Sequence, residues 1–159
     1  MSLVKRKSCR AVILSQENKI LLIKIENPEG SWEGWITPGG GVDDGEDEIS
    51  ALQRELYEEL GVNNLVIGVK IWMRFHSFPW KGDTIEQHEV FYLVHANCFN
   101  PKPSLHPDMP EFNDLKEFRW WAIDELKNTP EYLAPSRLSI YMQELLDNGP
   151  PSAPIDVGI

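Results

Sequence analysis

Three glutamates, Glu55, Glu58 and Glu59, lie at positions i, i+3 and i+4 of a segment with helical periodicity. In a helix this spacing places the three carboxylates on one flank, within an arc of about 100°. Like charges held so close repel one another, and partial burial would raise the pKa of at least one carboxyl. A hard divalent cation such as Mg²⁺, which prefers oxygen ligands, would relieve the repulsion. The pattern therefore indicates metal-dependent chemistry, although an acidic helix by itself is more often a solvated surface.

The helix that must carry these carboxylates is predicted over residues 46–60. Its first turn is acidic, which suits the positive end of the helix dipole, and Gly61 occupies the usual stop position. Its apolar residues are spaced 3, 4 and 4, which predicts one buried stripe made of Ile49, Leu52, Leu56 and Leu60.

Two features next to the glutamates could shape their surroundings. The run Gly39-Gly40-Gly41 precedes the helix and would let the backbone turn sharply and approach a ligand closely. Arg54 directly precedes Glu55, and we expect it to pair with Glu46 and orient the carboxylates.

Residues 40–62 have the sequence GGVDDGEDEISALQRELYEELGV. This segment resembles the signature of the Nudix (MutT-like) hydrolases, which is Gly, five residues, Glu, seven residues, then Arg-Glu-aliphatic-any-Glu-Glu-any-Gly-aliphatic. A chance match of this length would occur on the order of once in a million or more rarely. The matching positions are Gly40, Glu46, Arg54, Glu55, Leu56, Glu58, Glu59, Gly61 and Val62.

The resemblance implies an α/β fold, an α/β/α sandwich with a mixed β-sheet and a loop–helix–loop catalytic motif. It implies hydrolysis of the pyrophosphate bond in a nucleoside diphosphate linked to another moiety, such as a nucleotide or a sugar, with Mg²⁺ or Mn²⁺. It also implies that Glu55, Glu58 and Glu59 carry the metal and the activated water, helped by the carbonyl of Gly39. Glu55 is left as either a ligand or the base.

Many family members add an acidic residue from outside the motif. The candidates are Glu111 and Glu89, and the remaining alternative is that neither takes part.

Gly40 and Gly41 are expected to lie against the diphosphate of the substrate.

Specificity is expected outside the motif. Arg74 is a candidate for a substrate phosphate, with a solvated charge as the alternative. Five aromatic residues are candidates to stack on a base, with core packing as the alternative: Trp32, Trp35, Phe75, Phe78 and Trp80. The four histidines show no metal-ligand spacing and are interpreted as ordinary.

The remaining chain predicts a sheet interleaved with few helices, in one domain over residues 1–147. Residues 76–88 are predicted as the loop of a hairpin and residues 148–159 as a flexible tail. Strands are expected at 9–15, 19–26, 35–37, 65–75, 89–99 and 118–122, with further helices at 123–127 and 135–147.

Composition excludes several classes of protein. The chain has 159 residues and a formal charge of −10, which disfavours a general nucleic-acid or membrane-surface binder. Two cysteines exclude a disulfide framework or a cysteine zinc site and suggest the cytoplasm. No P-loop, dinucleotide-binding motif or membrane-spanning run is present.

The expected partner is a small molecule, and whether the protein forms a homodimer is left open. A Nudix-fold module that only binds nucleotide, and a different chemistry on the same scaffold, stay as alternatives.

Overall fold

The computed structural model describes residues 2–27, 29–103 and 115–159. The strands of this part form one nine-stranded mixed sheet. The elements, in chain order, are β1 (Leu3–Leu14), β2 (Ile20–Glu26), β3 (Glu33–Ile36), β4 (Gly39–Gly41), α1 (Glu48–Leu60), β5 (Lys70–Trp80), β6 (Asp83–His95), β7 (Leu115–Trp121), α2 (Ile123–Asn128), β8 (Leu133–Ala134), α3 (Leu138–Asn148) and β9 (Ile155–Asp156).

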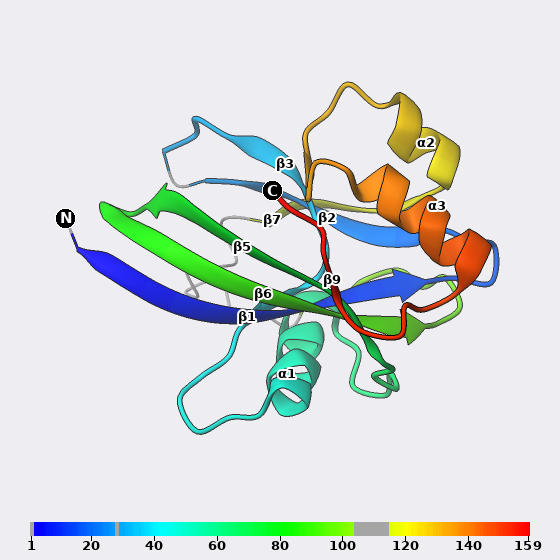
Figure 1. Cartoon of the computed structure of the whole chain (residues 1–159), viewed down its shortest axis with the longest axis horizontal. Coiled ribbons are helices and arrows are strands. Elements are labelled where there is room, and N and C mark those ends of the chain that lie inside the picture. The colour runs from blue at the N-terminus through cyan, green and yellow to red at the C-terminus, as the bar shows by residue number, and fades with distance from the viewer. Residues whose placement is uncertain (1, 28, 104–114) are drawn as a thin grey trace.

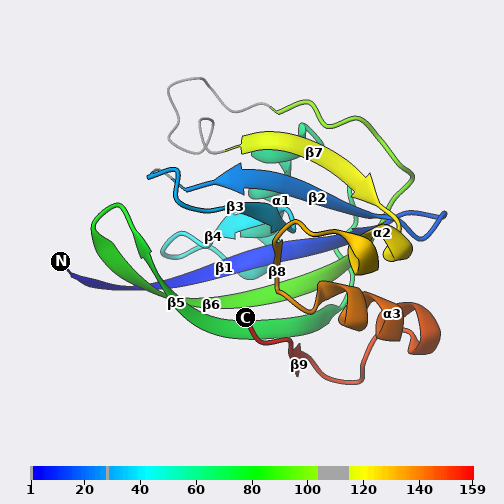
Figure 2. The same ribbon diagram turned by 90° about the horizontal axis from the view of Figure 1, so that it is seen from above.

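The sheet has the order β8-β3-β2-β1-β6-β5-β9, with β4 paired to β1 and β7 paired to β2. The pairs β1–β6, β3–β8 and β5–β9 are parallel, and the other pairs are antiparallel. Helix α1 lies on one face, and α2 and α3 lie on the other (Figure 1). Figure 2 shows the strands spread beneath α2 and α3. The predicted α/β/α sandwich with a mixed sheet is confirmed.

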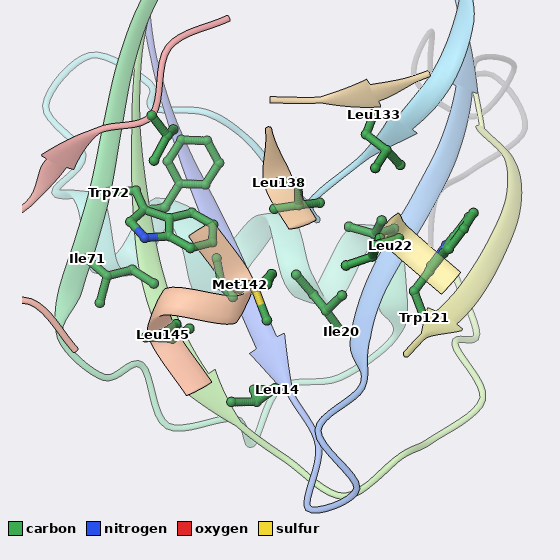
Figure 3. Packing of buried hydrophobic residues seen from close by; sticks show 14 of the residues in the cluster. Leu14, Ile20, Leu22, Ile71, Trp72, Trp121, Leu133, Leu138, Met142 and Leu145 are labelled. Carbon is green, nitrogen blue, oxygen red and sulfur yellow. The ribbon is translucent and has the colours of Figure 1, made fainter. Parts of the chain in front are cut away.

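Side-chain alternation along β1 divides the interior into two cores. Ala11 and Ile13 pack toward α1, together with residues of that helix. Val12 and Leu14 point to the opposite face and pack with α3. Figure 3 shows this second core, in which Leu138, Met142 and Leu145 of α3 lie over the sheet.

Strands β5 and β6 form a long hairpin that runs through residues 76–88, where the sequence predicts a loop. The two strands pair from Trp80–Asp83 back to Lys70–Tyr92. Lys81 and Gly82 form the turn with φ of 50° and 84°, and two successive positive φ values match the twist of a tight hairpin. Pro79 is tolerated because β9 pairs with β5 only at Trp72 and Met73, which leaves this end of β5 as an edge.

The last residues depart from the predicted flexible tail. Ile155 and Asp156 pair with β5, and Val157 is buried in the core beneath α3. The carbonyl of Ile159 accepts a hydrogen bond from the backbone N–H of Ser136 at 3.2 Å. Among the described helices, none is long and apolar enough to cross a membrane.

Candidate active site

Helix α1 begins two residues later than predicted because Asp47 caps it. The Asp47 carboxylate accepts hydrogen bonds from the backbone N–H of Ser50 at 2.8 Å and from its hydroxyl at 3.0 Å. At the other end Gly61 has φ of 72° and donates its N–H to Tyr57. This left-handed cap is the predicted glycine stop.

The buried arc of α1 is rotated relative to the predicted stripe. Leu52, Leu56 and Leu60 are buried as predicted, but Ile49 is 37% exposed, so its assignment to the stripe was wrong. Ala51 and Glu59 are buried instead, because the helix turns this side toward the sheet and leaves Ile49 at the margin of its first turn. Glu59 is thereby placed on the buried side of the helix.

Glu59 is enclosed between α1 and β4. It is 8% exposed, and its Oε1 accepts a hydrogen bond of 2.8 Å from the backbone N–H of Gly39. Burial raises the pKa of Glu59 to about 8, and the negative charges of Glu55 and Glu58 add to this, against the opposing charge of Arg10. Ionised Glu59 is therefore short of positive charge in the metal-free protein.

Glu55 packs directly against the glycine run. A Cβ at Gly40 would lie 2.4 Å from the Glu55 carboxyl group, so only glycine leaves room for it. A Cβ at Gly39, whose φ is +142°, would lie 2.0 Å from the carbonyl oxygen of Cys9. Burial, followed by the charge of Glu58, raises the pKa of Glu55.

Arg54 ties the motif together. It donates to both carboxylate oxygens of Glu46, from Nε at 3.0 Å and from Nη2 at 2.8 Å, which is the predicted pair. Its Nη1 donates to Glu55 at 3.0 Å, and Nη2 also donates to the carbonyl of Gly41 at 3.0 Å. The two bonds from Arg54 to Glu46, with one from the backbone N–H of Asp43, lower the pKa of Glu46 to about 2.

The donor set of this cluster suits a hard divalent cation. Among the residues described, no group of three or more His, Cys, Asp or Glu side chains is placed so that it could hold a metal ion. The carbonyl of Gly39 accepts from Arg10 Nη1 at 3.1 Å, and Glu58 lies 3.7 Å from Arg54. Even so, Glu55 and Glu59 both have raised pKa values. A divalent cation bound by these oxygens would offset their repulsion.

The cluster opens into a cavity of about 540 Å³. Gly39, Gly40, Glu55 and Glu59 line one end of it, whereas Glu58 and Gly41 do not line it. The cavity is also lined by the basic residues Arg6, Arg10, Arg74 and Lys81, and its aromatic lining residues include Trp32, Phe78, Trp80 and Tyr132. The cavity therefore combines carboxylates with cations and aromatic rings.

Glu89 occupies a different environment from the one expected of a metal ligand. It is 3% exposed. It accepts a hydrogen bond of 2.7 Å from Arg10 Nε, pairs with Arg74 Nε, and lies 3.1 Å from His76 Nε2. Burial opposes its charge, but Arg10, His76 and Arg74 together hold the pKa of Glu89 well below its ordinary value. Its two oxygens accept hydrogen bonds from Arg10 and Arg74, which argues against the alternative that Glu89 is a metal ligand. The other alternative, Glu111, lies outside the described residues.

The aromatic candidates separate into two groups. Trp35 is 1% exposed and packs edge-on against Trp121 at 5.1 Å, so it belongs to the core and not to a base-binding site. Phe75 is 58% exposed, but it stacks on His88 at 4.2 Å and does not line the cavity, which corrects its assignment as well. The second group, which lines the cavity, consists of Trp32, Phe78 and Trp80. The non-aromatic candidate Arg74 lines the cavity as well.

Sequence reasoning missed Arg10 and His76, which both contact Glu89. Arg10 is a charged residue inside an apolar strand, which is a usable signal because such a charge is seldom buried without a partner. His76 offered no comparable signal, since it was placed in a predicted loop.

The NUDIX domain family model matches residues 4–143. An RNA pyrophosphohydrolase from Rickettsia prowazekii is 31% identical over 124 residues, covering 72% of this chain and 73% of its own. An RNA pyrophosphohydrolase from Pelagibacter ubique is 25% identical over 150 residues, covering 89% of each chain. The crystal structure of a MutT protein from Methanosarcina mazei superposes with a TM-score of 0.66 at 18% identity, covering 91% of this chain and 94% of that one.

Members of this family generally use divalent metals, which agrees with the carboxylate chemistry at one end of the cavity. The family match, the two relatives and the shared fold together show that the chain belongs to the Nudix family and is a hydrolase that acts on pyrophosphate bonds.

Proposed function

We propose that this protein hydrolyses the pyrophosphate bond of a nucleoside diphosphate linked to another moiety, with Mg²⁺ or Mn²⁺ held by Glu55, Glu58 and Glu59. One observation carries the proposal. Glu55 and Glu59 lie beside Gly39 and Gly40 at one end of the cavity, and both have raised pKa values. A site with unrelieved negative charge beside an open cavity is suited to a cation and an anionic substrate.

The chain's own residues have distinct parts in this proposal. The N–H of Gly39 holds Glu59 in place, and Arg54 orients Glu55 while Glu46 anchors Arg54. Glu55 serves as a ligand or as the base that accepts a proton from water, and its raised pKa suits a proton acceptor. A bound divalent cation would supply charge neutralisation at the diphosphate and lower the pKa of a bound water.

A second candidate substrate is the 5′ end of an RNA, because the relatives from Rickettsia prowazekii and Pelagibacter ubique are named RNA pyrophosphohydrolases. A formal charge of −10 disfavours long contacts with a nucleic-acid backbone. It does not prevent one nucleotide end from entering the cavity. Trp32 and Trp80, which line the cavity, are the candidates to stack on the base of either substrate.

The binding-only alternative is disfavoured because the chain retains all the charged positions of the 40–62 motif. Cys9 and Cys98 are both free, which agrees with the reducing cytoplasm that we propose as its location.

The test is a substrate panel assayed with Mg²⁺ and with Mn²⁺, in which product analysis identifies the bond cut. The panel contains nucleoside triphosphates, dinucleoside polyphosphates, nucleotide sugars and a 5′-triphosphorylated oligoribonucleotide. We expect cleavage between phosphorus atoms, loss of activity in EDTA, and a higher melting temperature on adding either metal. Glu59→Gln should abolish the activity while the protein stays folded. Metal-independent cleavage, or a fully active Glu59→Gln protein, would refute the proposal.

A further inference from the structure

A basic wall of the cavity is built around one buried carboxylate. Glu89 of β6 receives Arg10 from β1 and Arg74 from β5, and these strands are neighbours in the sheet. Lys81 also lines the cavity. Glu89 carries one negative charge against the two positive charges of Arg10 and Arg74, so this group of three has a net positive charge.

Arg74 has unused donor capacity within this wall. It is 6% exposed, its Nε pairs with Glu89, and its Nη2 lies 3.1 Å from His76 Nε2. Its Nη1 is buried and, within the described part of the chain, has no hydrogen-bond partner. A buried donor left unsatisfied is costly, and charged groups are the costliest case. Because Arg74 lines the cavity, a ligand there could supply the missing acceptor.

Arg10 connects this wall to the motif. Its Nη1 donates to the carbonyl of Gly39 at 3.1 Å, and its Nε donates to Glu89 at 2.7 Å. Gly39 in turn holds Glu59 through its N–H. The basic wall and the carboxylate end are thus joined through one side chain, and both line the same cavity.

We propose that the wall formed by Arg10, Arg74 and Glu89 is a phosphate subsite, in which Arg74 Nη1 donates to a third phosphoryl group, beyond the two that the cleaved bond joins. Glu89 acts as a positioning residue, because its two oxygens hold the two guanidinium groups in place. A guanidinium group matches phosphate oxygens in charge and geometry. A neutral sugar at this place would supply no anionic acceptor for Arg74 Nη1.

This inference rests on the proposed function and narrows it: the moiety beyond the diphosphate is a further phosphate, so the substrate carries a 5′-triphosphate. The same chemistry occurs in a nucleoside triphosphate and at the 5′ end of an RNA. The cavity wall recognises the phosphate in both, and the hydrolysis assay distinguishes them.

The first test needs no hydrolysis. Inorganic pyrophosphate is titrated in EDTA by calorimetry into the wild-type protein, Arg74→Gln and Arg137→Gln. Arg137 is an exposed arginine that does not line the cavity, so its variant makes the same charge change elsewhere. We expect Arg74→Gln to weaken binding about tenfold or more, as for loss of a hydrogen bond to a charged group. Equal binding by Arg74→Gln, or no binding by wild type at millimolar pyrophosphate, would overturn the subsite.

The second test compares GTP with GDP-mannose, which share guanosine diphosphate and differ in the distal group. A 5′-triphosphorylated oligoribonucleotide beginning with guanosine is the third arm. We expect Arg74→Gln to lower kcat/KM about tenfold or more for both triphosphates and to leave that for GDP-mannose nearly unchanged. An equal loss on all three would overturn the inference while leaving the hydrolase proposal intact. If none of the three is cleaved, the wider substrate panel decides the proposed function, and the pyrophosphate titration still decides the subsite.

Arg74→Lys is a second variant for the case in which Arg74→Gln does not fold. Lysine retains the charge beside Glu89 but lacks the planar fork, so this variant should fold and bind pyrophosphate more weakly than wild type. If Arg74→Gln does not fold, wild-type affinity in a folded Arg74→Lys protein overturns the role of the guanidinium group.

Discussion

The carboxylate of Glu59 accepts a hydrogen bond of 2.8 Å from the backbone N–H of Gly39, across 20 positions of the chain. This bond fixes the buried side of α1 against β4. It also places a carboxyl group whose pKa is about 8 beside Glu55 and the cavity. The main helix and the glycine run are therefore joined through a side chain of the motif itself.

We predict that metal-free stability depends on pH through Glu59. Burial raises its pKa from an ordinary 4.5 to about 8, so the folded state keeps a proton that the unfolded chain releases. The resulting stabilisation is full below pH 4.5 and is lost as the pH rises to about 8. The melting temperature in EDTA should fall across this interval. Glu59→Gln should flatten the profile, whereas Glu17→Gln, an exposed control, should not. A wild-type profile that rises with pH in this interval contradicts the prediction.

Gly40→Ala should impair catalysis more than stability. The added Cβ would lie 2.4 Å from the Glu55 carboxyl group, which is the movable end of a side chain. Glu55 must shift, and a misplacement of about 1 Å can cost about a hundredfold in rate. Turnover and thermal unfolding are measured together. The control is Gly41→Ala, whose Cβ would meet only the Arg6 guanidinium at 3.1 Å. Normal turnover in Gly40→Ala would show that the position of Glu55 is not critical.

Arg54→Ala should lower turnover by about 10–100-fold, the usual effect of losing a residue that orients a ligand. Arg54 binds Glu46 through two hydrogen bonds and Glu55 through a third, so its loss releases Glu55. Steady-state kinetics should show a fall in kcat larger than any change in KM. Arg119→Ala, which removes a surface ion pair with Glu125, should leave kcat unchanged. If the two variants behave alike, the Arg54 contacts have no catalytic role.

Glu89→Gln should lower the free energy of unfolding and leave the affinity for Mn²⁺ unchanged. Removing one member of a buried ion cluster costs about 3–5 kcal/mol, because the remaining charges stay buried, and Arg10 and Arg74 would be left without their shared anion. Urea denaturation measures the loss, and Mn²⁺ titration measures metal affinity. Glu125→Gln disrupts an exposed pair and should cost about 1 kcal/mol or less. Weakened Mn²⁺ binding with normal stability would reinstate Glu89 as a metal ligand.

The features that follow from the sequence alone are the local ones. The 3, 4, 4 spacing of apolar residues and the glycine at 61 predict α1 and its end, because helical periodicity and capping depend on residues within a few positions. The pair Arg54–Glu46 is likewise predictable, since both residues belong to one motif of fixed spacing. The order of strands and helices, together with this motif, was sufficient to predict the α/β/α sandwich.

The tertiary structure decided which distant residues share the cavity. Arg10, Arg74 and Glu89 come from three strands that the register of β1, β5 and β6 brings together. It also buried Trp35 while leaving Trp80 at the cavity, although the two tryptophans look equivalent in sequence. The physical reason is that local spacing determines which side of a strand or helix a residue occupies. What that side faces depends on pairings between segments far apart in the chain. The pairing of β6 with β1 and β5 places Glu89, a candidate metal ligand in the sequence, between Arg10 and Arg74.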